Sequence, residues 1–213
     1  MSKVDAVMFD LDGTLWDSGD AAYESWIEAL KKEPDVTHLP TIDDFHGIMG
    51  LTPDNIMLKL YPDLDYDRRT ELFDTLQVAE NIVLAEKGGI HYEGMPEALK
   101  ELSENCKVSI ISNCGKGYIE AYLASMGTAD YISDIECAGN TGLPKADNIK
   151  LVVERNAYKN PVYVGDTIWD KESADAAGVP FIFCSYGFGD VPEAKYVVNT
   201  PAELPKLIAE MDI

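Results

Sequence analysis

Short apolar runs, each followed at once by a polar residue, constrain the fold of this chain more than any other feature. Four such runs lead to Asp10, Ser112, Asp166 and Ser185, and they cover residues 4–9, 107–111, 161–165 and 180–184. Nearly continuous apolar runs of this length are typical of strands buried on both faces, as in a parallel sheet. A weaker strand candidate covers residues 131–137.

Stretches with helical periodicity separate these runs. Apolar residues recur at helical spacing within residues 96–102, 119–126, 149–153 and 204–211. Pro96 stands where a first-turn proline is favoured, and Gly127 stands where a helix commonly ends. The alternation of strand and helix predicts an α/β fold with a doubly wound parallel sheet.

A long helical segment interrupts this alternation after the first strand. Residues from about 17 to 89 show apolar positions at helical spacing, such as Ala22, Trp26 and Leu30, and no convincing strand. The segment is much longer than an ordinary connection between neighbouring elements. We therefore predict a core domain of residues 1–16 and 90–213 and an inserted helical domain of residues 17–89, with Gly88-Gly89 as a hinge.

Composition and charge exclude several partners. The 213 residues include 17 Lys and Arg against 38 Asp and Glu, a net charge of −21, which disfavours nucleic acid and anionic membranes. No apolar run approaches the roughly 18 residues that a membrane span needs. The four cysteines are widely spaced, and no secretory signal is recognisable. We therefore expect a cytoplasmic protein with free thiols, present as a monomer or a weak homodimer.

Paired carboxylates stand at two of the predicted strand ends. The first strand runs into Asp10-Leu11-Asp12-Gly13-Thr14, and the strand of residues 161–165 leads to Asp166, with Asp170 four residues later. In open α/β sheets, ligands bind at the carboxyl ends of the strands. Carboxylates gathered there would repel one another unless a cation lay between them, and Mg²⁺ favours such oxygen ligands. The alternatives are a solvated Asp-Gly turn for the first pair and helix capping for the second.

Ser112, Asn113 and Lys145 are weak signals when each is taken alone. A serine after a strand is commonly part of a turn, and a lysine is commonly a solvated charge. Together with a metal ion, however, a hydroxyl, backbone N–H groups and an ammonium form a receptor for a phosphoryl group.

The ordered set of these motifs resembles the haloacid dehalogenase superfamily. The set comprises Asp10-x-Asp12-Gly13-Thr14, Ser112, Lys145 and Gly165-Asp166-x-x-x-Asp170. The helical insert is similar to the cap domain of that superfamily. The downstream runs 176–180 (AAGVP) and 186–189 (YGFG) are similar to its phosphoglycolate-phosphatase-like and β-phosphoglucomutase-like branch.

The resemblance implies a role for each matching residue. Asp10 would be the nucleophile, and Asp12 would be the general acid and base. Mg²⁺ would be held by Asp10, the main-chain carbonyl of Asp12, and Asp166, with Asp170 orienting a bound water. Ser112, Asn113 and Lys145 would bind the phosphoryl oxygens. Because Ala146 stands where relatives commonly have proline, Lys116 is an alternative to Lys145.

The inserted domain should determine which substrate is accepted. Cap loops close over the core and exclude water. We therefore expect the loop that contains Gly47, Met49, Gly50, Leu51 and Thr52 to set substrate specificity.

The resemblance favours a Mg²⁺-dependent phosphatase that hydrolyses a small phosphate monoester, of the phosphoglycolate or sugar-phosphate type, through an aspartyl-phosphate. The presence of Asp12 argues against dehalogenation, and the cap loop lacks the lysine that phosphonoacetaldehyde hydrolysis requires. Two alternatives stay open. One is a phosphosugar mutase in which Lys59, Arg68 or Arg69 holds a second phosphate, and the other is a catalytically idle metal-binding protein.

Overall fold

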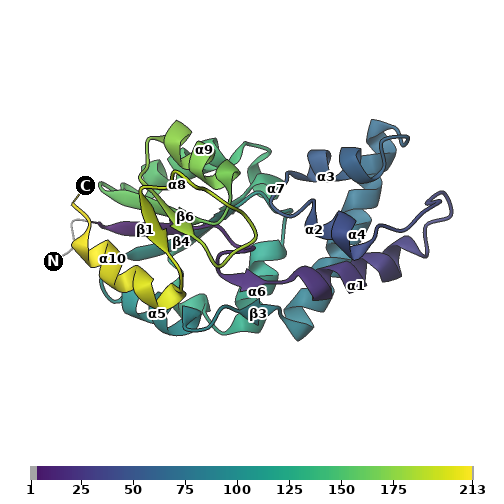
Figure 1. The fold of residues 1–213 in the computed structure, drawn as a ribbon. Helices are drawn as coiled ribbons and strands as arrows, with labels where there is room; N and C mark the ends of the chain where they lie inside the picture. Colours follow the sequence, from purple (N-terminus) through teal and green to yellow (C-terminus); the bar gives the residue numbers. More distant parts are fainter. Residues whose placement is uncertain (1–3, 213) are drawn as a thin grey trace.

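A six-stranded parallel sheet forms the centre of the molecule in the computed structural model, which describes residues 4–212 (Figure 1). The strand order is β5-β4-β1-β6-β7-β8. The strands are β1 (Ala6–Phe9), β4 (Lys107–Ser112), β5 (Asp134–Cys137), β6 (Pro161–Gly165), β7 (Phe181–Cys184) and β8 (Tyr196–Val198). The first five match the predicted runs. The sequence analysis did not predict β8, a short strand at the sheet edge.

Alternate residues of each central strand enter two different apolar layers. In β1, Val7 and Phe9 pack with one group of helices, and Ala6 and Met8 pack with the other. The first layer contains α5 (Met95–Ser103), α6 (Tyr118–Met126) and α10 (Leu204–Glu210), and the second contains α8 (Lys145–Asn156) and α9 (Ile168–Ala177). The remaining elements of this part of the chain are the one-turn α7 (Ala138–Thr141) and two 3-10 turns, Ala129–Tyr131 and Pro201–Glu203. The predicted doubly wound α/β fold is confirmed.

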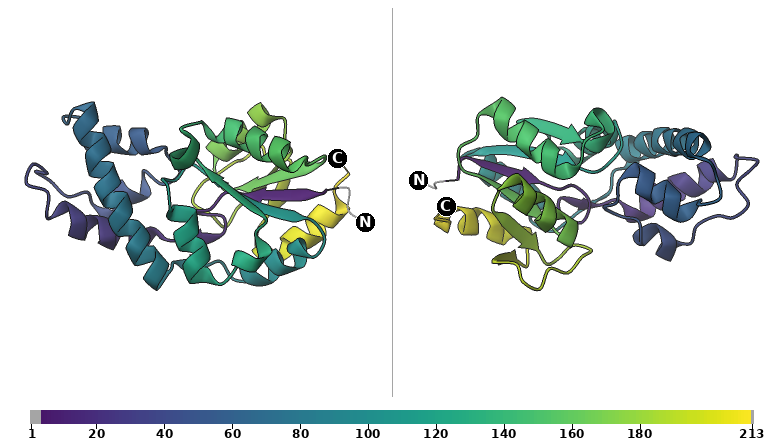
Figure 2. Two further views of the ribbon diagram at one scale, coloured as in Figure 1. Left: turned by 180° about the vertical axis from the view of Figure 1, so that it is seen from behind. Right: turned by 90° about the horizontal axis from the view of Figure 1, so that it is seen from above.

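The inserted segment forms a helical cap with its own apolar core. Its helices are α1 (Gly19–Leu30), α2 (Ile42–His46), α3 (Pro53–Leu60) and α4 (Tyr66–Lys87). They pack around Trp26, Phe45, Leu72 and Leu76, to one side of the sheet (Figures 1 and 2). Within residues 4–212 no helix, the 22-residue α4 included, is long and apolar enough to cross a membrane. The domain limits at residues 16/17 and 89/90 stay a prediction, and residues 1–3 and 213 lie outside the described part.

Two short strands connect the cap to the core. The chain leaves the core through β2 (Trp16–Asp17) and returns through β3 (Ile90–His91), and the two pair in antiparallel fashion. The sequence analysis expected no strand here, because a two-residue strand has no detectable periodicity. At Gly89 a Cβ atom would lie 2.6 Å from the Asp17 carbonyl oxygen, so this close approach requires glycine.

The strand order brings distant polar residues together. β1 lies between β4 and β6, with Phe9 opposite both Ile110 and Val164. The residues that follow these positions, Asp10, Ser112 and Asp166, therefore reach the same edge of the sheet. The cap stands beyond that edge (Figure 1).

Candidate active site

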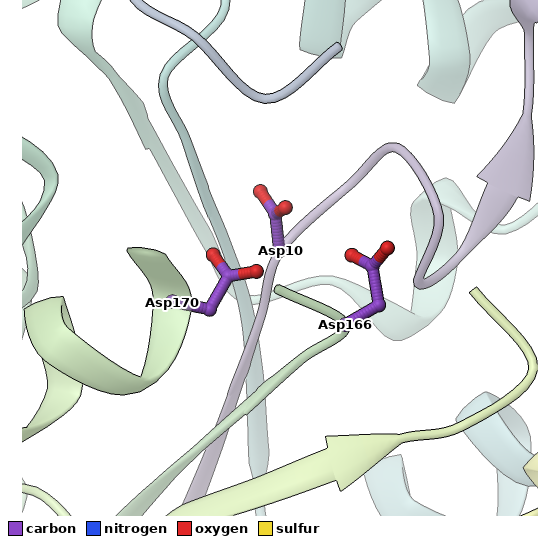
Figure 3. A group of neighbouring side chains, drawn as sticks. All are labelled: Asp10, Asp166 and Asp170. Atoms are coloured by element: carbon purple, nitrogen blue, oxygen red, sulfur yellow. The ribbon is translucent and has the colours of Figure 1, made fainter. Parts of the chain in front are cut away.

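Three buried aspartates from separate elements meet at the carboxyl edge of the sheet (Figure 3). Asp10 directly follows β1, Asp166 directly follows β6, and Asp170 lies in the first turn of α9. One carboxylate oxygen from each lies within 4.8 Å of the other two. The convergence that the sequence analysis expected from neighbouring strands is therefore present in the structure.

Lys145 is the cation that contacts this group. It is the first residue of α8 and only 4% exposed, and its Nζ lies 2.9 Å from Asp10 Oδ1 and 2.5 Å from Asp170 Oδ1. Pro144 stands immediately before it and starts the helix, although Ala146 replaces the proline expected after the lysine. Lys116, the alternative, is exposed and lines a different cavity. The geometry therefore favours Lys145.

The electrostatics of the group fit a divalent cation. Burial raises the pKa of Asp10 well above its ordinary value, and the neighbouring carboxylates of Asp170 and Asp166 raise it further against the opposing effect of Lys145. Burial and Asp170 likewise raise the pKa of Asp166 to about 7. Asp10 Oδ1 is buried, and no donor of standard hydrogen-bond geometry satisfies it within the described residues. Three carboxylates against one ammonium leave an excess of negative charge that an oxygen-liganded ion such as Mg²⁺ would neutralise.

Asp166 is held in place by its surroundings. Thr14 Oγ1 donates to Asp166 Oδ1 over 3.2 Å, and the Phe188 N–H donates to Oδ2 over 2.8 Å. Gly13 has a φ of +77°, and a Cβ there would lie 2.2 Å from Asp166 Oδ2. The Asp-Gly-Thr turn therefore provides both the space and one donor for this carboxylate.

The Asp12 carboxylate is held by three hydrogen-bond donors. Its Oδ1 accepts hydrogen bonds from Trp16 Nε1 (2.9 Å), Ser18 Oγ (2.8 Å) and Tyr118 OH (2.9 Å). Burial raises the pKa of Asp12, while hydrogen bonds from Ser18, Tyr118 and Trp16 lower it. A carboxyl with a raised pKa is suited to transfer protons. None of these three donors was predicted from the sequence. Tyr118 lies more than a hundred positions after Asp12, so no local sequence pattern indicates that the two side chains meet.

Asp170 caps a helix with one carboxylate oxygen and contacts Lys145 with the other. Its Oδ2 accepts from the N–H and the hydroxyl of Thr167, which forms a capping box at the start of α9. Its Oδ1 faces Lys145. Capping therefore orients this carboxylate toward the lysine.

A small cavity of about 70 Å³ separates the aspartates from the cap. Ser112, Asn113 and Lys145 line it from the core, and Met49, Gly50 and Leu51 line it from the cap loop. The Asn113 amide joins the two sides, because its Nδ2 donates to the Gly50 carbonyl over 3.1 Å.

Two of the predicted cap residues lie outside this cavity. Gly47 is the C-cap residue of α2, and its carbonyl accepts a hydrogen bond from Lys59 Nζ over 2.7 Å. Thr52 lines an adjoining shallow groove together with Trp169, and Gly50 lies against the Trp169 ring. The helical turn at residues 45–48 directs Ile48 and Met49 inward instead.

The cavity also contains polar residues of the cap that the sequence analysis missed. Glu80 of α4 is 7% exposed, and burial, with a further contribution from Asp12, raises its pKa to about 8. Trp26 of α1 lies on the same wall. A signal for Glu80 existed, because it lies four residues after Leu76 and four before Leu84. It therefore occupies the same buried face of α4 as these two leucines.

Comparison with known proteins identifies the class that this fold and site define. The family model described as "Haloacid dehalogenase-like hydrolase" matches residues 7–184, so the chain belongs to the haloacid dehalogenase-like hydrolases. The expected family and the expected enzyme class are confirmed.

The relatives of this chain include phosphatases. A phosphoglycolate phosphatase of Rhodobacter capsulatus is 28% identical over 195 residues, which cover 88% of this chain and 87% of the relative. An N-acetylmuramic acid 6-phosphate phosphatase of Pseudomonas putida is 25% identical, covering 97% and 96%. The crystal structure of a predicted phosphatase from Clostridium acetobutylicum superimposes with a TM-score of 0.80 at 24% identity, covering 98% and 99%, and shows the shared fold.

Proposed function

We propose that this protein is a Mg²⁺-dependent phosphatase that hydrolyses a small phosphate monoester, of the phosphoglycolate or sugar-phosphate type, through an aspartyl-phosphate. The observation that carries the proposal is the buried group of Asp10, Asp166 and Asp170 with Lys145 against Asp10. The curated relatives named above support the choice of a phosphate ester as substrate.

Two ligands of the proposed metal site, the carboxylates of Asp10 and Asp166, are already close together. Asp10, the main-chain carbonyl of Asp12, and Asp166 would hold Mg²⁺, with Asp170 behind them orienting a bound water. When bound, the ion would offset the repulsion between a carboxylate nucleophile and an anionic ester.

The reaction then has two steps, formation of the aspartyl-phosphate and its hydrolysis, and each residue has a separate role in them. Asp10 attacks phosphorus, and Asp12 donates a proton to the departing oxygen. Asp12 next takes a proton from the water that hydrolyses the aspartyl-phosphate. Lys145, Ser112 and Asn113 hold the phosphoryl oxygens as negative charge develops. Asp12 accepts hydrogen bonds from Trp16 and Ser18, whereas Asp10 contacts Lys145, so the two carboxylates have separate surroundings and separate tasks.

The mutase alternative has less support from the geometry. Two of its three candidate cations are engaged elsewhere, since Arg68 pairs with Glu33 and Asp35, and Lys59 binds the Gly47 carbonyl. Arg69 lines a neighbouring groove of about 510 Å³.

The test of the proposal is Asp10→Asn. We expect wild type to release p-nitrophenol from p-nitrophenyl phosphate only with Mg²⁺ present and to accumulate acid-stable, hydroxylamine-sensitive phosphoprotein. Asp10→Asn should lose turnover by about a thousand-fold or more, because the amide is a poor nucleophile. Exposed Asp147→Asn is the matched control and should retain activity. Turnover by Asp10→Asn near the wild-type rate would remove Asp10 from the nucleophile's role, and no release by Mg²⁺-loaded wild type would favour the idle metal-binding protein.

A further inference from the structure

The cap side of the active-site cavity is apolar except at Glu80 and Trp26. The other cap residues that line it are Phe45, Ile48, Met49, Gly50, Leu51, Pro53, Ile56 and Phe73. A carboxyl group in such a wall costs folding free energy, because burial disfavours its charged form. Glu80 therefore calls for an explanation that the packing of α4 does not provide.

The polar groups that face this part of the cavity are incompletely satisfied. Trp26 is 2% exposed, and its Nε1 has no hydrogen-bond partner of standard geometry, although the indole N–H acts on Glu80 strongly enough to lower its pKa. On the core side, Asn113 Oδ1 is buried and equally without a partner. Buried polar groups in proteins are normally paired with protein, water or ligand. One donor, Trp26 Nε1, and one acceptor, Asn113 Oδ1, thus remain for a molecule inside the cavity, beside the Glu80 carboxyl group.

The charges that line the cavity are unsuited to an anionic leaving group. Of the described residues that line it, Lys145 is the one with a cationic side chain, and it is already in contact with Asp10 and Asp170. The part of the substrate that extends from Asp12 toward the cap would instead face Glu80. A carboxylate there would find no cation of its own. A hydroxyl or an ammonium could donate to Glu80 or to Asn113 Oδ1, and a hydroxyl could also accept from Trp26.

We propose that Glu80, together with Trp26 and Asn113, determines specificity by selecting phosphate monoesters whose leaving group carries a hydrogen-bond donor, a hydroxyl or an ammonium, and by rejecting a carboxylate. The inference rests on the proposed phosphatase function and narrows its substrate class. It places sugar, polyol and amino-alcohol phosphates ahead of phosphoglycolate for this chain.

Three two-carbon esters that differ in one group test the proposal at pH 9, where Glu80, with a pKa of about 8, is ionised. They are 2-hydroxyethyl phosphate, O-phosphoethanolamine and 2-phosphoglycolate, with p-nitrophenyl phosphate as a generic substrate. We expect kcat/KM of Mg²⁺-loaded wild type for the hydroxyl ester or the ammonium ester to exceed that for phosphoglycolate by about ten-fold or more, because a buried acceptor left unpaired is costly.

Variants at the cap wall locate the selectivity. At pH 9, above the pKa of about 8 at which Glu80 loses its proton, Glu80→Gln keeps the size of the side chain and removes its charge. It should reduce the ratio of kcat/KM for the ammonium ester to that for phosphoglycolate by about ten-fold. Trp26→Phe keeps an aromatic side chain, a smaller one, and removes the N–H, and it should lower the ratio of kcat/KM for the hydroxyl ester to that for p-nitrophenyl phosphate. Glu86→Gln, exposed on the same helix, is the matched control and should leave every ratio unchanged.

The outcomes separate this inference from the function on which it rests. If wild type hydrolyses p-nitrophenyl phosphate but prefers phosphoglycolate, or accepts none of the three esters, the inference is wrong and the phosphatase stands. The inference is equally wrong if folded Glu80→Gln, checked by circular dichroism, slows all four substrates by the same factor. If Mg²⁺-loaded wild type hydrolyses no ester at all, the proposed function fails and the inference fails with it.

Discussion

Several ionisable residues of the active site are buried, and the charge of each depends on its neighbours. Lys145 is 4% exposed and touches two carboxylates, so removing the lysine would leave Asp10 and Asp170 buried without their cation. Uncompensated buried charge is strongly destabilising. Glu80 lies at the other extreme, because burial and the neighbouring Asp12 raise its pKa, and no cation among residues 4–212 is recorded as opposing them.

Glu80 should make the stability of the protein depend on pH. Its pKa rises from an ordinary 4.5 to about 8 on folding, so between these values the folded state binds a proton that the unfolded state lacks. Stability therefore falls as pH rises through this interval. Each pKa unit corresponds to about 1.4 kcal/mol. Glu80→Gln removes the penalty and should gain at least about 2 kcal/mol over wild type between pH 5 and pH 8.

Urea unfolding of metal-free protein at the two pH values measures this difference in the free energy of unfolding. Glu86→Gln, at an exposed position of α4, should follow the wild-type pH dependence. Parallel curves for wild type and Glu80→Gln would mean that Glu80 keeps an ordinary pKa in the folded protein.

At the scale of elements, α4 is the helix that joins the cap to the core. It packs against α1 within the cap and against α6 of the core. Gln77 Nε2 and Asn81 Nδ2 both donate to the Lys116 carbonyl, over 2.7 and 2.9 Å, in the loop that follows Ser112. A Cβ at Gly115 would lie 2.1 Å from Gln77 Nε2, so the two elements are in close contact. These bonds favour the arrangement in which the cavity is small.

Removing both donors should make closure of the cap less favourable. We expect the Gln77→Ala/Asn81→Ala double variant to reduce kcat/KM by about ten-fold, because two hydrogen bonds contribute roughly 0.5–1.5 kcal/mol each. Steady-state kinetics with p-nitrophenyl phosphate measure the effect. Thr75→Ala, which removes only a bond from Thr75 to its own helix, is the control. Equal kinetics for the double variant and this control would show that the contact has no part in closure.

At the scale of the whole molecule, the net charge of −21 opposes the approach of an anionic ester. The local cations act only at contact distance, whereas the surface charge acts over the Debye length, about 10 Å in 0.1 M salt. Salt should therefore assist this enzyme at the encounter step, in contrast to enzymes whose surfaces attract their substrates.

Added KCl should raise kcat/KM for a dianionic ester. We expect an increase of about two- to five-fold between roughly 0.02 and 0.2 M KCl, measured at saturating Mg²⁺ so that weaker metal binding does not interfere. O-phosphoethanolamine, whose ammonium offsets part of its charge, should respond less than 2-hydroxyethyl phosphate. A decrease in kcat/KM with salt for both esters would show that local cations dominate the encounter.

Much of the fold, and the gathering of Asp10, Asp166 and Asp170 at one edge of the sheet, followed from the sequence because the signals are local. The apolar run before Asp10 and the one before Asp166 each predict a strand, and a parallel sheet places the residues after them at one edge. The strands that were not predicted are those whose sequence pattern is too short to detect. β8 spans only Tyr196–Val198 at the sheet edge, and β2 with β3 has only two residues a strand.

By itself, then, the sequence determined the five longer strands, the main helices and which acidic residues follow the strands, since hydrophobic periodicity and turn residues act over a few positions. Only the tertiary structure decided what those residues face. Tyr118 reaches Asp12, Lys145 reaches Asp10, and Glu80 enters the cavity because packing of the cap against the core brings together groups that are far apart in the chain. Hydrogen bonds and pKa shifts depend on distance in space and on burial, and spacing along the chain encodes neither.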